Sequence, residues 1–206
     1  MGALKRIAFG VALTIFAITW IAPLWPLEHA LHSSLTVAGV IWLLHDRRWP
    51  MRNGDFIAIC AFVVVHSVAA RWLYSNVPYD AWLRAAFGWS PQAAFGWQRN
   101  HFDRLIHLLF GLCFTPMLTA HAHQRWAVSV AQGFALAVMA VGLIYEWLEW
   151  AIALLLSPDQ AEAYKGQQGD IWDAHMDMLL ATIGAVVSWP WLDRRPSPGG
   201  RAAVSP

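Results

Sequence analysis

Apolar residues along the chain fall into long runs that short polar connections separate. A helix needs roughly 17–25 residues to cross a bilayer, and the runs have about this length. The pattern therefore predicts an all-α fold, a polytopic transmembrane helical bundle of about six spans. The spans are expected at residues 6–24, 27–45, 55–74, 101–120, 127–156 and 171–192.

Composition supports the membrane class. Hydrophobic residues make up 58% of the chain and charged residues 13%, against about 45–50% and about 25% in an average soluble protein. A single integral membrane domain is expected over residues 1–192. Residues 193–206 are rich in Pro, Gly and Arg and are expected to form a disordered cytoplasmic tail.

The connection 75–100 differs from the other polar segments in its length. It contains prolines together with Trp82, Trp89 and Trp97, and tryptophan favours the boundary between lipid and water. We expect an amphipathic stretch that lies at the membrane surface.

The positions of Lys and Arg predict the orientation. An even number of spans puts both termini on one side, together with the loops 46–54 and 121–126. Most of the 14 Lys and Arg lie on that side, whereas the opposite side carries Arg84, Arg99 and Lys165. The positive-inside rule then predicts a multi-pass protein of the inner (cytoplasmic) membrane with both termini cytoplasmic.

Ionisable residues recur at one predicted depth, near the outer leaflet, in four of the expected spans. Spacings of three and four residues place Asp103 with His107, Glu146 with Glu149, and Asp170 with Asp173 and Asp177 on one helix face each. The sets are His66 and Arg71; Asp103, Arg104 and His107; Glu146 and Glu149; and Asp170, Asp173 and Asp177. Because charge within a bilayer costs at least about 2.5–3.5 kcal/mol per group, these three helix faces are expected to face the interior of the bundle.

The carboxylates of this cluster outnumber its two arginines, Arg71 and Arg104. The excess must be protonated, hydrated or neutralised by a cation. Oxygen ligands with a histidine suit a divalent metal such as Mg²⁺, Ca²⁺, Mn²⁺ or Zn²⁺. The candidate metal ligands are Asp103, His107, Glu149, Asp173 and Asp177. Glu146 is a candidate acid–base group, and Arg71 and Arg104 could hold a phosphate or carboxylate of a substrate.

Several segments together resemble the YjdF-like family of uncharacterised bacterial inner-membrane proteins. They are VVVHSVAARWLYSNVP, QRNHFDRLIHLLFGL, YEWLEW and GQQGDIWDAHMDMLLATIGA, in this order. The resemblance implies a polytopic membrane protein but no activity. It points to His66, Tyr74, Pro78, Arg99, Asn100, Asp103, Arg104, His107, Glu146, Glu149, Gln168, Gly169, Asp170, Asp173 and Asp177. Asp103-Arg104-x-x-His107 is also distantly similar to VanZ-like membrane proteins.

The chain departs from the family pattern at two places. Ala69 and Ala70 stand where the family has glycines, and His175 stands where it has glutamine. The second departure argues against His175 as a required ligand.

Three functions are compatible with the cluster. The first is a membrane enzyme, metal-dependent or acid–base, that acts on a lipid or envelope substrate. The second is a structural or partner-binding protein whose ion pairs only fasten helices. The third is a transporter coupled to protons or cations through Glu146, Glu149 and Asp177.

Simpler explanations are open for several of these residues. Asp170 could simply favour a helix N-terminus, and His66 and His107 could be hydrogen-bonded core residues. His29 and His32 are expected at the lipid–water interface. The expected partners are membrane lipids, no motif indicates nucleic acid, and nothing names a protein partner.

Overall fold

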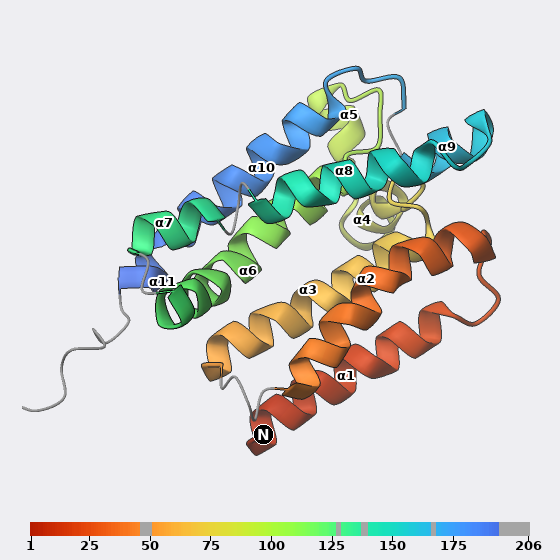
Figure 1. Ribbon diagram of the computed structural model, residues 1–206. Helices are drawn as coiled ribbons and strands as arrows, with labels where there is room; N and C mark the ends of the chain where they lie inside the picture. The colour runs from red at the N-terminus through yellow and green to blue at the C-terminus, as the bar shows by residue number, and fades with distance from the viewer. Residues whose placement is uncertain (46–50, 127–128, 137–139, 166–167, 194–206) are drawn as a thin grey trace, which may run out of the picture.

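The structure is a computed structural model that describes residues 1–45, 51–126, 129–136, 140–165 and 168–193. All regular elements in these residues are helices (Figure 1), which confirms the predicted all-α bundle. The helices are α1 (Ala3–Thr19), α2 (Pro26–Leu44), α3 (Asn53–Arg71), α4 (Tyr79–Phe87), α5 (Pro91–Phe95), α6 (Phe102–Trp126), α7 (Val130–Ala135), α8 (Val141–Ala153), α9 (Pro158–Lys165), α10 (Asp173–Val187) and α11 (Trp189–Asp193).

Each expected span contains a helix, but the helices differ in length. In the part of the chain that is described, α2, α3 and residues Phe102–His123 of α6 are long and apolar enough to cross a bilayer. The region of the expected fifth span, 127–156, contains two helices, α7 and α8. The region of the sixth contains α10 and the short α11. A bundle of six spans stays a prediction. Apart from Asp193, the expected tail lies outside the described residues.

Helices α6 and α10 pack closely because glycine lets their backbones meet. A Cβ at Gly184 would lie 2.0 Å from the Leu108 carbonyl oxygen, and a Cβ at Gly111 would lie 1.9 Å from the Ala181 carbonyl oxygen. Small residues at such contacts are characteristic of helix pairs in membranes, where close backbone approach supplies much of the packing energy. This contact fixes the side chains of the two helices relative to one another.

A second packed layer consists of α1, α2 and α3, which joins α6 through an apolar core. Phe56, Ile59, Leu43 and Met117 are among its buried residues. Glycine is not needed here, because large side chains fill the space between the helices. The α6–α10 pair and the layer of α1, α2 and α3 together surround the polar residues of α6, α8 and α10.

The two ends of the bundle have different contents. The N-terminus and α11 lie toward one end, and α4, α5 and α9 lie toward the other (Figure 1). Phe87, Trp89 and Phe95 are exposed on the α4–α5 segment. This arrangement agrees with the expectation of an amphipathic stretch in residues 75–100.

Candidate functional site

Arg99 brings three carboxylates together at the α4–α5 end of the bundle. Its Nη1 donates to Asp170 Oδ2 at 3.0 Å and to Asp173 Oδ1 at 2.7 Å, and its Nη2 donates to Asp103. Arg104 pairs with Asp170 as well. We call these residues the arginine network: Arg99, Asp103, Arg104, Asp170 and Asp173. The network joins the start of α6 to the start of α10.

The turn that precedes α10 positions Asp170. Gln168 and Gly169 both have positive φ, at 51° and 79°, a backbone region that glycine adopts without strain. The Gln168 side chain accepts from the Asn100 backbone N–H at 2.9 Å and donates to the Asn100 carbonyl at 3.0 Å. The turn is therefore tied to the segment that carries Arg99.

Asp170 also serves the start of α10. Its Oδ1 accepts from the Trp172 backbone N–H at 2.9 Å. This hydrogen bond, followed by those from Arg99 and the charge of Arg104, lowers the pKa of Asp170 below its usual value. Asp170 thus accepts a hydrogen bond within the turn before α10, whose N-cap is Trp172, and it also pairs with the arginines.

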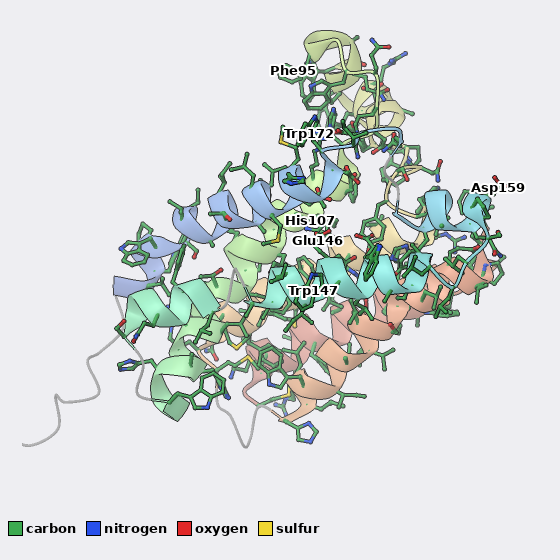
Figure 2. All side chains as sticks on the ribbon, turned by 45° about the horizontal axis from the view of Figure 1, so that its top comes forward. Phe95, His107, Glu146, Trp147, Asp159 and Trp172 are labelled. Atoms are coloured by element: carbon green, nitrogen blue, oxygen red, sulfur yellow. The ribbon has the colours of Figure 1, made fainter. Side chains whose placement is uncertain are left out.

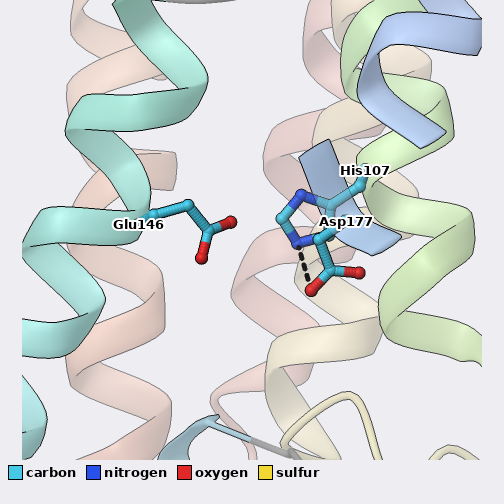
Figure 3. Close-up of side chains that lie close together, drawn as sticks. All are labelled: His107, Glu146 and Asp177. Atoms are coloured by element: carbon cyan, nitrogen blue, oxygen red, sulfur yellow. Dashed lines mark ion pairs between the residues drawn. The ribbon is translucent and has the colours of Figure 1, made fainter. Parts of the chain in front are cut away.

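A different arrangement lies one helical turn deeper. His107 of α6, Glu146 of α8 and Asp177 of α10 each offer a ligand atom, and these atoms lie within 4.8 Å of one another. His107 Nε2 is 3.5 Å from Asp177 Oδ2. Figure 3 shows Glu146 pointing across from α8 toward this pair. We call these residues the His107–Glu146–Asp177 site. Figure 2 places His107 and Glu146 in the interior, away from Phe95 and Trp172 at the bundle end.

This second site has polar atoms without partners. Asp177 is only 5% exposed, and its Oδ1 accepts no hydrogen bond. Glu146 Oε1 is likewise buried without a partner. An unsatisfied buried polar group costs about 1–3 kcal/mol, and more if it is charged. Such atoms call for an explanation, and a bound cation or proton supplies one.

Asp103, Asp173 and Asp177 form a second set of possible ligands, whose atoms also lie within 4.8 Å of one another. Arg99 already pairs with Asp103 and Asp173. A cation in this set would compete with a guanidinium group, whereas a cation in the His107–Glu146–Asp177 site would not. The geometry therefore favours the deeper set.

Arg71 and Glu149 lie elsewhere. Arg71 donates from Nη1 to the carbonyls of Thr19 and Ile21, at 2.6 and 2.8 Å. A cation at these carbonyls stabilises the end of α1, because the end of a helix has unpaired carbonyls. Glu149 belongs to neither set of ligands, although it lies within electrostatic range of Asp177 as well as of Tyr74 and Tyr164. The structure thus joins Asp103, Arg104, His107, Glu146, Asp173 and Asp177 in one region, but it does not bring Arg71 to them.

Reasoning from the residues alone gave Arg99 no role, although the family resemblance pointed to it. Arg99 precedes Asp103 by four residues, a spacing that favours ion pairs. It lies in a connection before α6, so it was assigned to the outer loop. The spacing was the signal that could have placed it in the cluster.

Three other histidines are buried near α2 and α3. His66 Nδ1 and Thr36 Oγ1 are 2.8 Å apart, and so are His66 Nε2 and the Tyr74 hydroxyl. His66 is therefore a hydrogen-bonded core residue, as one reading expected. His29 and His32 are 0% and 3% exposed. Trp20 packs against His29 and Tyr164 stacks on His32, so both histidines contact protein side chains, and their depth at the lipid–water interface stays a prediction.

The fold and the buried polar site define a helical membrane protein. The chain belongs to the family described as "Predicted membrane protein (DUF2238)", which matches residues 4–197. It is 27% identical over 183 residues to Inner membrane protein YjdF of Escherichia coli strain K12, an alignment that covers 86% of this chain and 78% of that protein. These findings confirm the resemblance to the YjdF-like family. No solved structure matches the chain.

Proposed function

We propose that this protein is a membrane-embedded enzyme that holds a divalent cation at the His107–Glu146–Asp177 site and acts on a lipid or envelope substrate. One observation carries the proposal. The buried Asp177 Oδ1 has no partner, although a histidine and a second carboxylate face Asp177 from two other helices. Three helices thus present one nitrogen and two oxygen ligands to one point.

The donor set fits a cation. Around a cation with bonds of about 2.0–2.2 Å, ligand atoms lie no more than roughly 4.4 Å apart. The atoms of this site lie within 4.8 Å of one another, so small side-chain rotations would bring them to bonding distance. Two carboxylates and an imidazole suit Zn²⁺ or Mn²⁺, and Mg²⁺ when more of the ligands are water. A bound cation would polarise a carbonyl or phosphoryl oxygen or activate water.

The arginine network has a positioning role in this proposal. It joins α6 to α10 one turn above the site, and so it sets the distance between His107 and Asp177. Arg104 keeps one buried donor, Nε, without a partner. This donor is the group that we assign to an anionic part of the substrate.

The proposed orientation places both termini in the cytoplasm. In the sequence, most Lys and Arg fall in segments that the predicted six-span topology puts on the same side as the N-terminus. The arginine network and the His107–Glu146–Asp177 site would then lie toward the outer leaflet, where envelope lipids are present.

The structural alternative has support at the arginine network. Its three carboxylates and two guanidinium groups pair with one another, which is what a lock between helices requires. The alternative does not account for the unpartnered atoms of Asp177 and Glu146.

Metal content of the purified protein tests the proposal. The wild type and an Asp177→Asn variant would be purified in detergent, supplied with Mg²⁺, Mn²⁺, Ca²⁺ or Zn²⁺, desalted and measured by mass spectrometry. We expect near-stoichiometric metal in the wild type and its loss in the variant. Asp80→Asn is the matched control, because Asp80 binds Ser90 and Arg84 outside the site.

Two outcomes would count against the proposal. A wild type that takes up none of the four metals would sink the metal centre. Equal metal in the wild type and Asp177→Asn would place the cation elsewhere. Where metal binds as expected, hydrolysis of envelope lipids by the wild type, and its loss in Asp177→Asn, tests the enzymatic part.

A further inference from the structure

An apolar cavity adjoins the His107–Glu146–Asp177 site. It has a volume of about 330 Å³ and lies between α2, α3, α6, α8 and α10. Aromatic and aliphatic side chains form most of its wall, among them Trp42, Phe62, Phe110, Phe114 and Met178. Its size is at the lower end of the range of about 300–1,000 Å³ for ligand sites.

The few polar groups of the cavity gather at one level. Thr36, His66, His107 and Tyr145 contribute to the wall. The first two satisfy one another by a hydrogen bond, and His107 also belongs to the proposed metal centre. A ligand would therefore meet polar chemistry at the His107 level and apolar chemistry elsewhere.

The cavity is elongated along the helices. On α6 its wall extends from Ile106 to Leu118, and twelve residues of helix rise about 18 Å. On α2 it extends from Leu35 to Trp42 in the same direction. A space that is narrow, apolar and parallel to the spanning helices has the shape and direction of a lipid tail in a bilayer.

We propose that this cavity binds one acyl chain of a membrane phospholipid, with the lipid head group at the His107–Glu146–Asp177 site. The position of the head group rests on the proposed function, whereas the binding of the acyl chain in the cavity does not. Phospholipid is the bulk solvent of a membrane protein, so a continuous apolar cavity between its helices is in contact with that ligand at high concentration. Burial of a methylene from water is favourable, but a tail that moves from lipid into the cavity gains less free energy. Specificity must then come from the polar end.

Gly39 offers a way to fill the cavity without disturbing the fold. It lies on the cavity wall, and a Cβ at this position would meet no atom within 4 Å. A phenylalanine side chain would extend into the cavity, and replacement of a helical glycine removes a backbone entropy cost. Gly10 is the matched control, because it lies in α1, has the same open surroundings and is not on the cavity wall.

The test uses photo-crosslinking. The full chain would be reconstituted in vesicles that contain a phosphatidylethanolamine with a diazirine in one acyl chain. After illumination, mass spectrometry would locate labelled residues. We expect labels on Phe110, Phe114 or Met178 in the wild type and in Gly10→Phe, and a loss of about tenfold or more in Gly39→Phe. Gly39→Leu, a smaller change, should reduce the label less and serves if Gly39→Phe does not fold.

Other outcomes would overturn the assignment. Labels only on lipid-facing residues such as Ile7 and Val11, which are exposed on α1, would show that no tail enters the cavity. Cavity labels that Gly39→Phe and Gly39→Leu leave unchanged would show that the tail does not occupy this space. If a diazirine polyprenyl phosphate labelled the cavity in preference to the phospholipid, the ligand of the cavity would be a prenyl chain and not an acyl chain.

Metal content separates this inference from the proposed function. Asp177→Asn should lose the metal and keep the labels on the cavity wall. A wild type without metal, but with labels that Gly39→Phe removes, would keep the tail site and sink the metal centre. A wild type that binds metal but shows no cavity labels would support the metal centre and overturn the tail site.

Discussion

The arginine network and the His107–Glu146–Asp177 site lie one helical turn apart along α6 and α10, and α8 adds Glu146 to the second. At the level of Asp103 and Asp173, Arg99 pairs with both carboxylates. At the level of His107 and Asp177, the described residues place no arginine or lysine, and one carboxylate oxygen of Asp177 has no hydrogen bond. A single turn thus separates carboxylates that share an arginine from a carboxylate that faces only a histidine and keeps one oxygen without a hydrogen bond.

The difference shows what each part is suited to do. Buried carboxylates that are fully paired hold helices in place, because removal of one partner leaves an uncompensated charge. Buried carboxylates without partners destabilise the bundle until something binds them. A ligand that binds only the folded protein raises its free energy of unfolding. The arginine network therefore resembles a support, and the deeper site resembles a binding site.

The largest effect on stability is expected from Arg99→Met. This change leaves three carboxylates without their shared cation, so we expect the free energy of unfolding to fall by about 3–5 kcal/mol. Thermal unfolding in detergent, followed by circular dichroism, would measure it. Arg84→Met is the control, since the Arg84 side chain is 64% exposed beside Asp80 and such pairs contribute roughly 0.2–1 kcal/mol. Equal effects of the two changes would contradict a supporting role for Arg99.

Asp177→Asn should act in the opposite direction. In metal-free protein we expect the free energy of unfolding to stay the same or to rise by about 1–3 kcal/mol, because the change removes an unsatisfied buried charge. In the wild type, metal at 100 times its Kd should add about 2.7 kcal/mol, and this increment should vanish in the variant. The same thermal unfolding, with and without metal, gives both values.

Asp103→Asn provides the contrast for this result. Asp103 pairs with Arg99, so the same chemical change one turn away should lower the free energy of unfolding. If Asp177→Asn is as destabilising as Asp103→Asn in metal-free protein, the distinction between the two regions fails.

Acid should weaken the arginine network. The folded-state pKa of Asp170 is lowered by the Trp172 N–H and by the arginines, so its contribution is present above the unfolded pKa of about 3.9 and is lost as pH falls through the folded pKa. We expect the unfolding midpoint to decrease below about pH 4, and Asp170→Asn to remove part of this decrease. Unfolding scans from pH 7 to pH 3 would measure it.

Asp80 provides an independent acid-sensitive group. The Ser90 hydroxyl and the Gln92 N–H lower its pKa as well, so Asp80→Asn should remove a separate part of the decrease. If the unfolding midpoint of Asp170→Asn decreased at low pH as much as that of the wild type, the role given to Asp170 would be contradicted.

The smallest effect is expected at His175. It is exposed on α10, and surface changes of this kind usually alter stability by less than about 0.5 kcal/mol. We expect His175→Gln to change neither the unfolding midpoint nor the metal content, whereas His107→Gln should lose the metal. Loss of metal in His175→Gln would move the site toward the turn before α10.

Much of this architecture could be predicted from the chain. The helical bundle followed from the length of the apolar runs, because a segment in lipid must satisfy its own backbone hydrogen bonds. The inward placement of Asp103 and Asp177 followed from the cost of charge in lipid, since it depends on burial alone. Partner choice was harder: the sequence placed Arg71 with the carboxylates and Arg99 in a loop, whereas Arg99 pairs with them and Arg71 donates to the end of α1.

By itself, then, the sequence determined the membrane class, the helical segments and the set of residues that must be hidden from lipid. The tertiary structure decided which of them meet. Gly111 and Gly184 bring α6 and α10 into backbone contact, and this contact sets Asp103 with Asp173 at one level and His107 with Asp177 at the next. Period and hydropathy are local properties of a segment. The register between two helices depends on shape across their interface, so no pattern along either one contains it.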